Sequence, residues 1–180
     1  ETGIFERWLA GDTVLDPTVG DGSFILSLLN LASEKKIKIS KKMVSNLFGF
    51  DLKQSGIDSI LREAKENFEI NLLGENFVCT DVATTKFTKK FDCIIGNPPW
   101  VSFAKLPPEY KEILKARFIE YGLTNTNNTL LLGSSRVDLA ALIVNVAIAD
   151  LAKESTTIAF FLPGSMFFGG SAHEAFRNFE

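Results

Sequence analysis

The chain has 180 residues, of which 46% are hydrophobic and 23% charged, a composition typical of one globular domain. Its formal net charge of −3 and pI of about 5.3 argue against a nucleic-acid-binding surface that covers most of the chain. No apolar run reaches the roughly 20 residues of a membrane span, and the first residues lack the layout of a secretion signal, so we expect a cytoplasmic protein without a membrane partner.

Cysteine and histidine are scarce. Two cysteines and one histidine are too few for a metal site built from nitrogen and sulfur ligands, or for a disulfide framework. Cys79 and Cys93 lie in strand-like runs, so we expect both to be buried free thiols. His173 stands in a helix-like segment, which favours a hydrogen-bonded or exposed surface residue over a catalytic one.

Short apolar runs alternate with helix-like segments along the chain. Strands are predicted at 13–16, 47–51, 77–81, 91–96 and 157–162. Helices are predicted at 23–32, at 57–68, after Pro107–Pro108, and at 134–154, where Ser135 and Asp138 are expected to form a capping box. This alternation predicts an α/β fold with a mainly parallel sheet and helices on both faces.

Four polar residues follow the predicted strands. The first three strands end in Asp16, Asp51 and Asp81, and Asn97 follows the fourth. Ligands of open parallel sheets bind beyond the carboxyl ends of the strands, so these side chains are predicted to converge on one ligand site. Acids after strands can also cap helices, an interpretation that accounts for one or two of them and poorly for all four.

Two segments stand outside this alternation. Residues 101–133 form a long excursion that ends in the polar tract TNTNNT, and it is either a lid or partner-binding loop or a feature without function. The basic run KKIKISKK (35–42) is interpreted as a solvated loop rather than a phosphate contact.

The stretch DPTVGDGSF (16–24) forms the turn between the first strand and the first helix. Gly20 and Gly22 permit a tight bend and let a ligand approach the backbone. A carboxylate at Asp16 would repel a pyrophosphate but suits an ammonium or sulfonium group, which favours S-adenosylmethionine over NAD. Asp51 is placed to accept hydrogen bonds from ribose hydroxyls. Asp81 is placed to accept one from an adenine amine, with Val82 packing on the ring.

The motifs DPTVGDGSF, FGFD, CTD, NPPW and LPGSMFFGGSAHEAFR, in this order, resemble those of the gamma-class amino-methyltransferases that methylate adenine in DNA. The resemblance covers essentially the whole chain, and NPPW (97–100) is its most specific part. Thr18–Val19 and Asp21 depart from the commoner Ala-Cys and Ser of the first motif.

The resemblance implies a Rossmann-like fold and S-adenosylmethionine-dependent methylation of the exocyclic amine of adenine in DNA, within a restriction–modification system. The cofactor-binding residues it implies are Asp16, Pro17, Gly20, Gly22, Phe24, Asp51, Leu52, Asp81 and Val82. The catalytic residues it implies are Asn97, Pro98, Pro99 and Trp100, with no metal.

The chemistry of an aromatic amine explains the tetrapeptide. Its lone pair is delocalised into the ring, so two hydrogen-bond acceptors are needed to draw the nitrogen toward a tetrahedral shape. The Asn97 side-chain oxygen and the Pro98 carbonyl are the expected acceptors, held in place because prolines restrict the backbone. Trp100 offers a flat face for a base taken out of its stack.

The same resemblance implies that residues 1–180 are a truncated catalytic domain, without the target-recognition domain and the final strand hairpin of family members. Its expected partners are double-stranded DNA with a flipped adenine and either a specificity subunit or a fused nuclease. Two alternatives stay open. One is a methyltransferase for a protein glutamine or an RNA base, and Trp100 argues mildly against this alternative. The other is a non-catalytic subunit, against which Asn97 and Asp51 argue.

Overall fold

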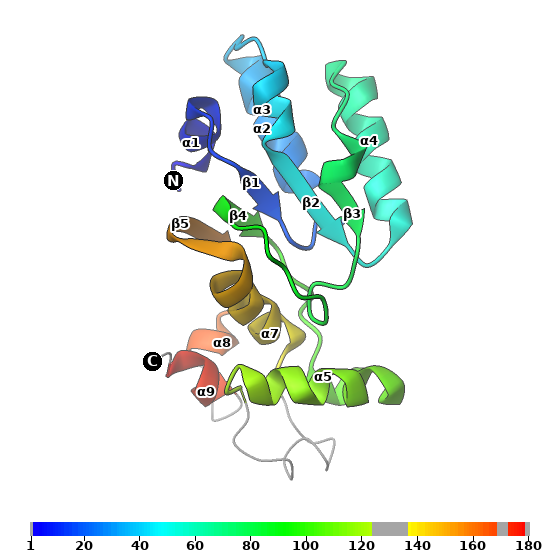
Figure 1. Cartoon of the computed structure of the whole chain (residues 1–180), viewed down its shortest axis with the longest axis vertical. Coiled ribbons are helices and arrows are strands. Elements are labelled where there is room, and N and C mark those ends of the chain that lie inside the picture. The colour runs from blue at the N-terminus through cyan, green and yellow to red at the C-terminus, as the bar shows by residue number, and fades with distance from the viewer. Residues whose placement is uncertain (1, 124–136, 169–172, 179–180) are drawn as a thin grey trace.

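The computed structural model describes residues 2–123, 137–168 and 173–178, and its centre is a five-stranded sheet (Figure 1). The strand order is β3-β2-β1-β4-β5, and all four neighbouring pairs are parallel. The strands are β1 (Val14–Asp16), β2 (Leu47–Asp51), β3 (Phe77–Cys79), β4 (Phe91–Gly96) and β5 (Ala152–Phe160). The sheet confirms the predicted parallel α/β class.

Helices cover both faces of this sheet. The first layer holds α1 (Ile4–Ala10), α2 (Ser23–Glu34), α3 (Lys41–Ser45) and α4 (Gln54–Phe68). The second holds α5 (Pro108–Glu120), α7 (Leu139–Val146) and a π-helical turn η3 (Ala147–Leu151). Short elements complete the described chain: η1 (Gly74–Asn76), η2 (Phe103–Lys105), α8 (Ser165–Phe168) and α9 (Glu174–Arg177). In Figure 1, α2 and α4 lie on one side of the strands and α7 on the other.

Successive residues at the start of β1 and of β2 point into different cores. Val14 and Leu47 pack into the apolar cluster beneath α1 to α4, whereas their neighbours Leu15 and Phe48 pack into the cluster beneath α5 and α7. This is the two-residue period of a strand, and it requires apolar residues at nearly every position because both faces are covered. The continuous apolar runs in the sequence therefore reflect strands that are covered on both faces of the sheet.

The helix predicted at 134–154 is wrong at both ends. Asp138 is itself the N-cap residue of α7, and Ser135 lies outside the described residues. At the other end the chain becomes strand β5 at Ala152, because Lys153 pairs with Asp92 and the Thr156 hydroxyl donates to the Phe91 carbonyl. These contacts hold the polar start of β5 beside β4, a tertiary effect that local periodicity does not contain.

Cys93 is buried as predicted, but the prediction for Cys79 is wrong, since that side chain is exposed. The reason is the position of β3 at the edge of the sheet, where Val78 and Cys79 are left uncovered. His173 is a hydrogen-bonded residue, as predicted. It is buried, and its Nε2 lies 3.2 Å from a carboxylate oxygen of Asp138.

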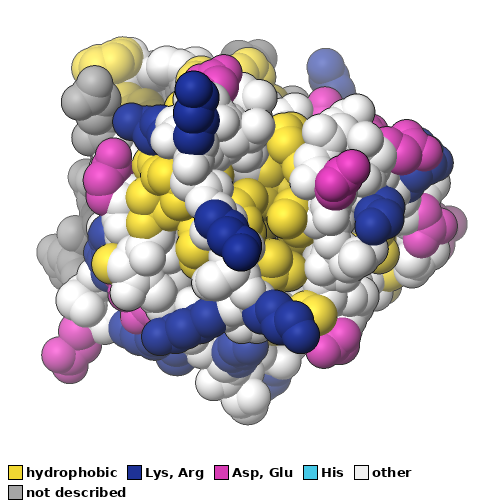
Figure 2. Space-filling view, turned by 90° about the horizontal axis from the view of Figure 1, so that it is seen from above, with side chains coloured by type: hydrophobic (Ala, Val, Ile, Leu, Met, Phe, Trp, Pro, Cys, Tyr) yellow, Lys and Arg dark blue, Asp and Glu magenta, His cyan; other side chains and the backbone are white. Residues whose placement is uncertain are grey.

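The basic run at 35–42 follows α2 and extends into the first turn of α3, at the end of the molecule opposite α5 (Figure 1). Its five lysines are all exposed, which supports the interpretation as a solvated segment. Viewed from above Figure 1, basic side chains lie among apolar and acidic ones (Figure 2). The polar tract 124–129 lies outside the described residues. In the described ranges, no helix has the length and apolar character needed to cross a membrane.

Candidate functional site

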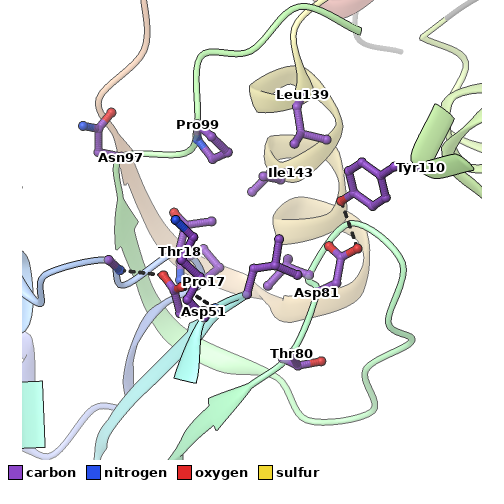
Figure 3. Close-up of a pocket in the computed structure, with 14 residues that line it drawn as sticks. Pro17, Thr18, Asp51, Thr80, Asp81, Asn97, Pro99, Tyr110, Leu139 and Ile143 are labelled. Atoms are coloured by element: carbon purple, nitrogen blue, oxygen red, sulfur yellow. Dashed lines mark hydrogen bonds between the residues drawn. The ribbon is translucent and has the colours of Figure 1, made fainter. Parts of the chain in front are cut away.

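A cavity of about 390 Å³ opens at the carboxyl ends of the strands, and we call it the strand-end cavity (Figure 3). It lies where the strand order reverses, since the chain runs from β1 to β2 and β3 on one side and returns to β4 on the other. This is the place where open parallel sheets bind their ligands. The lining residues are Pro17, Thr18, Gly20, Asp51, Leu52, Lys53, Thr80, Asp81, Val82, Asn97, Pro99, Tyr110, Leu139 and Ile143.

Asp51, the last residue of β2, fixes the turn between β1 and α2. Its Oδ2 accepts a hydrogen bond from the backbone N–H of Gly20 at 2.8 Å, and its Oδ1 accepts one from the N–H of Lys53 at 2.8 Å. Gly20 and Gly22 have φ angles of 53° and 82°, which favour glycine. The turn thus brings the backbone of the DPTVGDGSF stretch against the carboxylate of the neighbouring strand.

Asp81 follows β3 and faces the cavity from the other side. Its Oδ1 accepts from the N–H of Ala83 at 2.9 Å, and its Oδ2 accepts from the hydroxyls of Thr84 at 3.0 Å and Tyr110 at 2.9 Å (Figure 3). Asp51 is not the N-cap residue of α4, because Lys53 occupies that position, and the element that follows Asp81 is the strand β4 and not a helix. The helix-cap interpretation therefore does not account for these two acids.

Asp16 lies beneath the cavity and is only 1% exposed. Burial raises the pKa of its carboxyl group from 3.8 to about 7, although a hydrogen bond from the N–H of Thr18 works in the opposite direction. The carboxylate rests against β4, where a Cβ at Gly96 would lie 2.9 Å from Asp16 Oδ1. Asp16 is thus in contact with the strand end that carries Asn97.

This close approach gives a testable consequence for stability. We expect Gly96→Ala to lower the free energy of unfolding by about 1–3 kcal/mol, because the new methyl group overpacks a buried site. Gly74→Ala is the matched control, since a Cβ there meets nothing within 4 Å. Urea denaturation of both variants measures the difference. Equal stabilities would show that Asp16 and β4 can separate without cost.

The NPPW stretch begins directly after β4. Asn97 and Pro99 line the cavity, whereas Pro98 is buried and Trp100 is 53% exposed. In Figure 3, Asn97 lies apart from Asp51 and Asp81 among the lining residues, and its amide group points away from both. The indole N–H of Trp100 donates to the carbonyl of Phe161, the residue after β5, at 3.4 Å.

The structure brings eight of the thirteen predicted site residues to the cavity wall: Pro17, Gly20, Asp51, Leu52, Asp81, Val82, Asn97 and Pro99. The other five do not line it: Asp16, Gly22, Phe24, Pro98 and Trp100. Phe24, at the start of α2, packs its ring against Phe161 with a centroid separation of 6.2 Å.

Sequence reasoning missed six lining residues: Thr18, Lys53, Thr80, Tyr110, Leu139 and Ile143. Leu139 and Ile143 lie four residues apart on α7, and their shared face was readable from helical spacing once the start of α7 is known. Tyr110 belongs to the excursion, where no motif marked it.

The residues present fit S-adenosylmethionine. Asp51 and Asp81 offer carboxylate acceptors for hydroxyl and amine groups, while Val82, Leu139 and Ile143 form an apolar wall. The Thr18 hydroxyl is buried and has no hydrogen-bond partner among the described residues, so a ligand can supply one. The volume is in the range of small-molecule sites. No group of three potential metal ligands from His, Cys, Asp and Glu occurs in the part of the chain that the structure describes.

Solved structures of restriction enzymes are among those that share this fold. The type IIG restriction endonuclease BpuSI matches 98% of the chain with 19% identity and a TM-score of 0.66. A nuclease-deletion mutant of the Type ISP restriction-modification enzyme LlaGI, in complex with a DNA substrate mimic, matches 92% with 18% identity and a TM-score of 0.66. The chain spans only 20% and 18% of the length of these two proteins.

Sequence comparison is more specific about ancestry. No curated protein matches the chain in sequence. The family model described as Eco57I restriction-modification methylase matches residues 21–180, which include every predicted site residue except Asp16, Pro17 and Gly20. The chain therefore belongs to the Eco57I restriction-modification methylase family.

Proposed function

We propose that residues 1–180 form the catalytic domain of an S-adenosylmethionine-dependent enzyme that methylates the exocyclic amine of adenine in DNA. One observation carries this proposal: Asn97 and Pro99, from the NPPW stretch, line the same cavity as Asp51 and Asp81. A cofactor held by the two carboxylates and a substrate held by Asn97 would therefore meet in one space. Membership of a restriction-modification methylase family supports the reaction class.

The cofactor contacts follow from the acceptors that line the cavity. Asp51 would accept hydrogen bonds from the ribose hydroxyls, and Asp81 would accept one from the adenine amine, with Val82 against the ring. Asp16, beneath the cavity, would favour the positive charge of the methionine part. When bound, S-adenosylmethionine supplies an electrophilic methyl group.

The chain's own contribution to the reaction is orientation. The Asn97 side-chain oxygen and the Pro98 carbonyl would each accept a hydrogen bond from the target amine, which localises its lone pair. Trp100 and Phe161 are 53% and 67% exposed and are joined by the indole hydrogen bond, so aromatic faces stand beside Asn97. A planar base out of its stack would find a partner there.

DNA recognition would depend on more than this domain. The net charge is −3, so a basic surface for the phosphate backbone would have to come from another part of the complete protein or from a specificity subunit. A fused nuclease is in keeping with the two structural relatives, of which one is a restriction endonuclease and the other a nuclease-deletion mutant.

One experiment tests this function against its alternatives. The complete protein is incubated with S-adenosylmethionine labelled in the methyl group, together with DNA, RNA and a mixture of proteins. Label in DNA that digests to the nucleoside N6-methyl-2′-deoxyadenosine supports the proposal. Label in RNA or in protein glutamine would replace it with the second interpretation, and cofactor binding without any transfer would indicate a non-catalytic subunit.

Trp100 provides a further check on the substrate side. We expect Trp100→Ala to raise the KM for DNA about tenfold or more, because base–aromatic stacking contributes about 1–3 kcal/mol. Cofactor affinity should stay unchanged, since Trp100 does not line the cavity. Ile113→Ala removes a side chain that is 58% exposed on α5 and serves as the control. An unchanged KM for Trp100→Ala would exclude it as the stacking residue.

A further inference from the structure

Tyr110 joins the excursion to the cavity. It lies in the first turn of α5, lines the cavity and donates a hydrogen bond from its hydroxyl to Asp81 Oδ2 at 2.9 Å (Figure 3). The side chain is half-buried, and desolvation together with the neighbouring carboxylate raises its pKa. The phenol therefore keeps its proton and acts toward Asp81 as a donor.

The hydrogen bonds of Asp81 leave one acceptor position of its carboxylate unused among the described residues. An ionised carboxylate offers about four lone-pair sites. Among the described residues, Oδ2 receives two donors, from Thr84 and Tyr110, whereas Oδ1 receives one, from the N–H of Ala83. The remaining acceptor position is on Oδ1, so this carboxylate is arranged to take one more donor from a ligand.

A second contact holds α5 on the same loop. The Nε of Arg117, two turns further along the helix, donates to the carbonyl of Ala83 at 3.1 Å. Its guanidinium also contacts Glu120, Tyr121 and Asp150, and the side chain is buried. Helix α5 of the excursion is thus hydrogen-bonded to the segment after β3 at both Asp81 and Ala83.

We infer that Tyr110 is a positioning residue that makes Asp81 selective for an amine on the purine of the cofactor. This inference rests on the proposed function, since it takes the ligand of the cavity to be an S-adenosyl compound. With Tyr110 as a fixed donor, Asp81 is held as an acceptor. A 6-amino group supplies the missing donor, whereas a 6-oxo group places a second acceptor against the carboxylate and is rejected.

The test compares two ligands, S-adenosylhomocysteine and S-inosylhomocysteine, by titration calorimetry with the complete protein. We expect the wild-type protein to prefer the adenosyl compound by about a hundredfold, in keeping with a hydrogen bond to a charged group. Tyr110→Phe should weaken adenosyl binding by about tenfold and leave inosyl binding nearly unchanged, so that the preference falls by about tenfold.

Tyr121→Phe is the matched control. Its hydroxyl donates to Asp150 at 2.8 Å and accepts from Arg117, so the variant loosens the anchoring of α5 without touching Asp81. It should leave the ratio of the two affinities unchanged. If Tyr110→Phe weakened the binding of both ligands equally, or of neither, the role of Tyr110 would be overturned while the proposed function would stand. A wild-type protein that binds neither ligand would overturn the proposed function and this inference together.

Discussion

Asn97→Ala is expected to lower kcat for methyl transfer by about a hundred- to a thousandfold, the usual cost of removing one preorganised hydrogen-bonding group that aids the reacting centre. The Kd for S-adenosylhomocysteine should change little. Asp51 and Asp81, the carboxylates proposed to hold the cofactor, lie elsewhere on the cavity wall, and the Asn97 amide points away from both (Figure 3). Single-turnover transfer of a labelled methyl group to DNA measures the first quantity, and calorimetry measures the second.

Asn30→Ala is the matched control for this variant. Asn30 is exposed on α2 and donates to Glu34, away from the cavity residues, so kcat and Kd should both stay at wild-type values. A rate within about tenfold of wild type for Asn97→Ala would exclude Asn97 as a catalytic group. A loss of cofactor affinity equal to the loss of rate would instead make Asn97 a cofactor residue.

The strand ends were the most predictable part of the site. A parallel sheet covered on both faces demands apolar strands, so an acid or amide directly after each strand stands out in the sequence. Asp51, Asp81 and Asn97 do meet at one cavity for this reason. Asp16 follows the same pattern but is buried beneath the others, because Gly96 lets β4 approach its carboxylate. The order of residues along the chain predicts at which edge of the sheet a side chain lies. It does not predict whether that side chain is exposed in the cavity or buried.

The second layer of helices was less predictable. Tyr110 reaches the cavity from α5 only because Arg117 and Tyr110 both bind the loop after β3, a contact between segments that are about 30 residues apart. The start of β5 has the same character, since Lys153 pairs with Asp92 across the sheet. Side chains that bridge distant segments leave no period in the sequence, so neither feature could be predicted from it.

The buried carboxyl group of Asp16 is expected to make the stability of the protein fall between about pH 4 and pH 8. Burial raises its pKa from 3.8 to about 7, so the folded protein holds this proton over a range in which the unfolded chain has lost it. The contribution is fully present below the unfolded pKa and is lost as the pH rises through the folded pKa. The shift corresponds to at most about 4 kcal/mol.

Asp16→Asn removes the titration, so the free energy of unfolding of this variant should exceed that of the wild-type protein by a margin that grows between pH 5 and pH 8. Asp21→Asn is the control: hydrogen bonds from Ser23 lower the pKa of Asp21, so its titration lies below this window and the slope should remain. Urea denaturation at both pH values measures the slopes.

The ionisation of Asp16 also links pH to cofactor binding. A cation beside Asp16 favours the ionised form of its carboxyl group, so S-adenosylhomocysteine should bind more tightly to the wild-type protein at pH 8 than at pH 6. A pH-independent affinity would mean that the positive group of the cofactor lies away from Asp16, and the assignment of this carboxylate to the methionine end would fail.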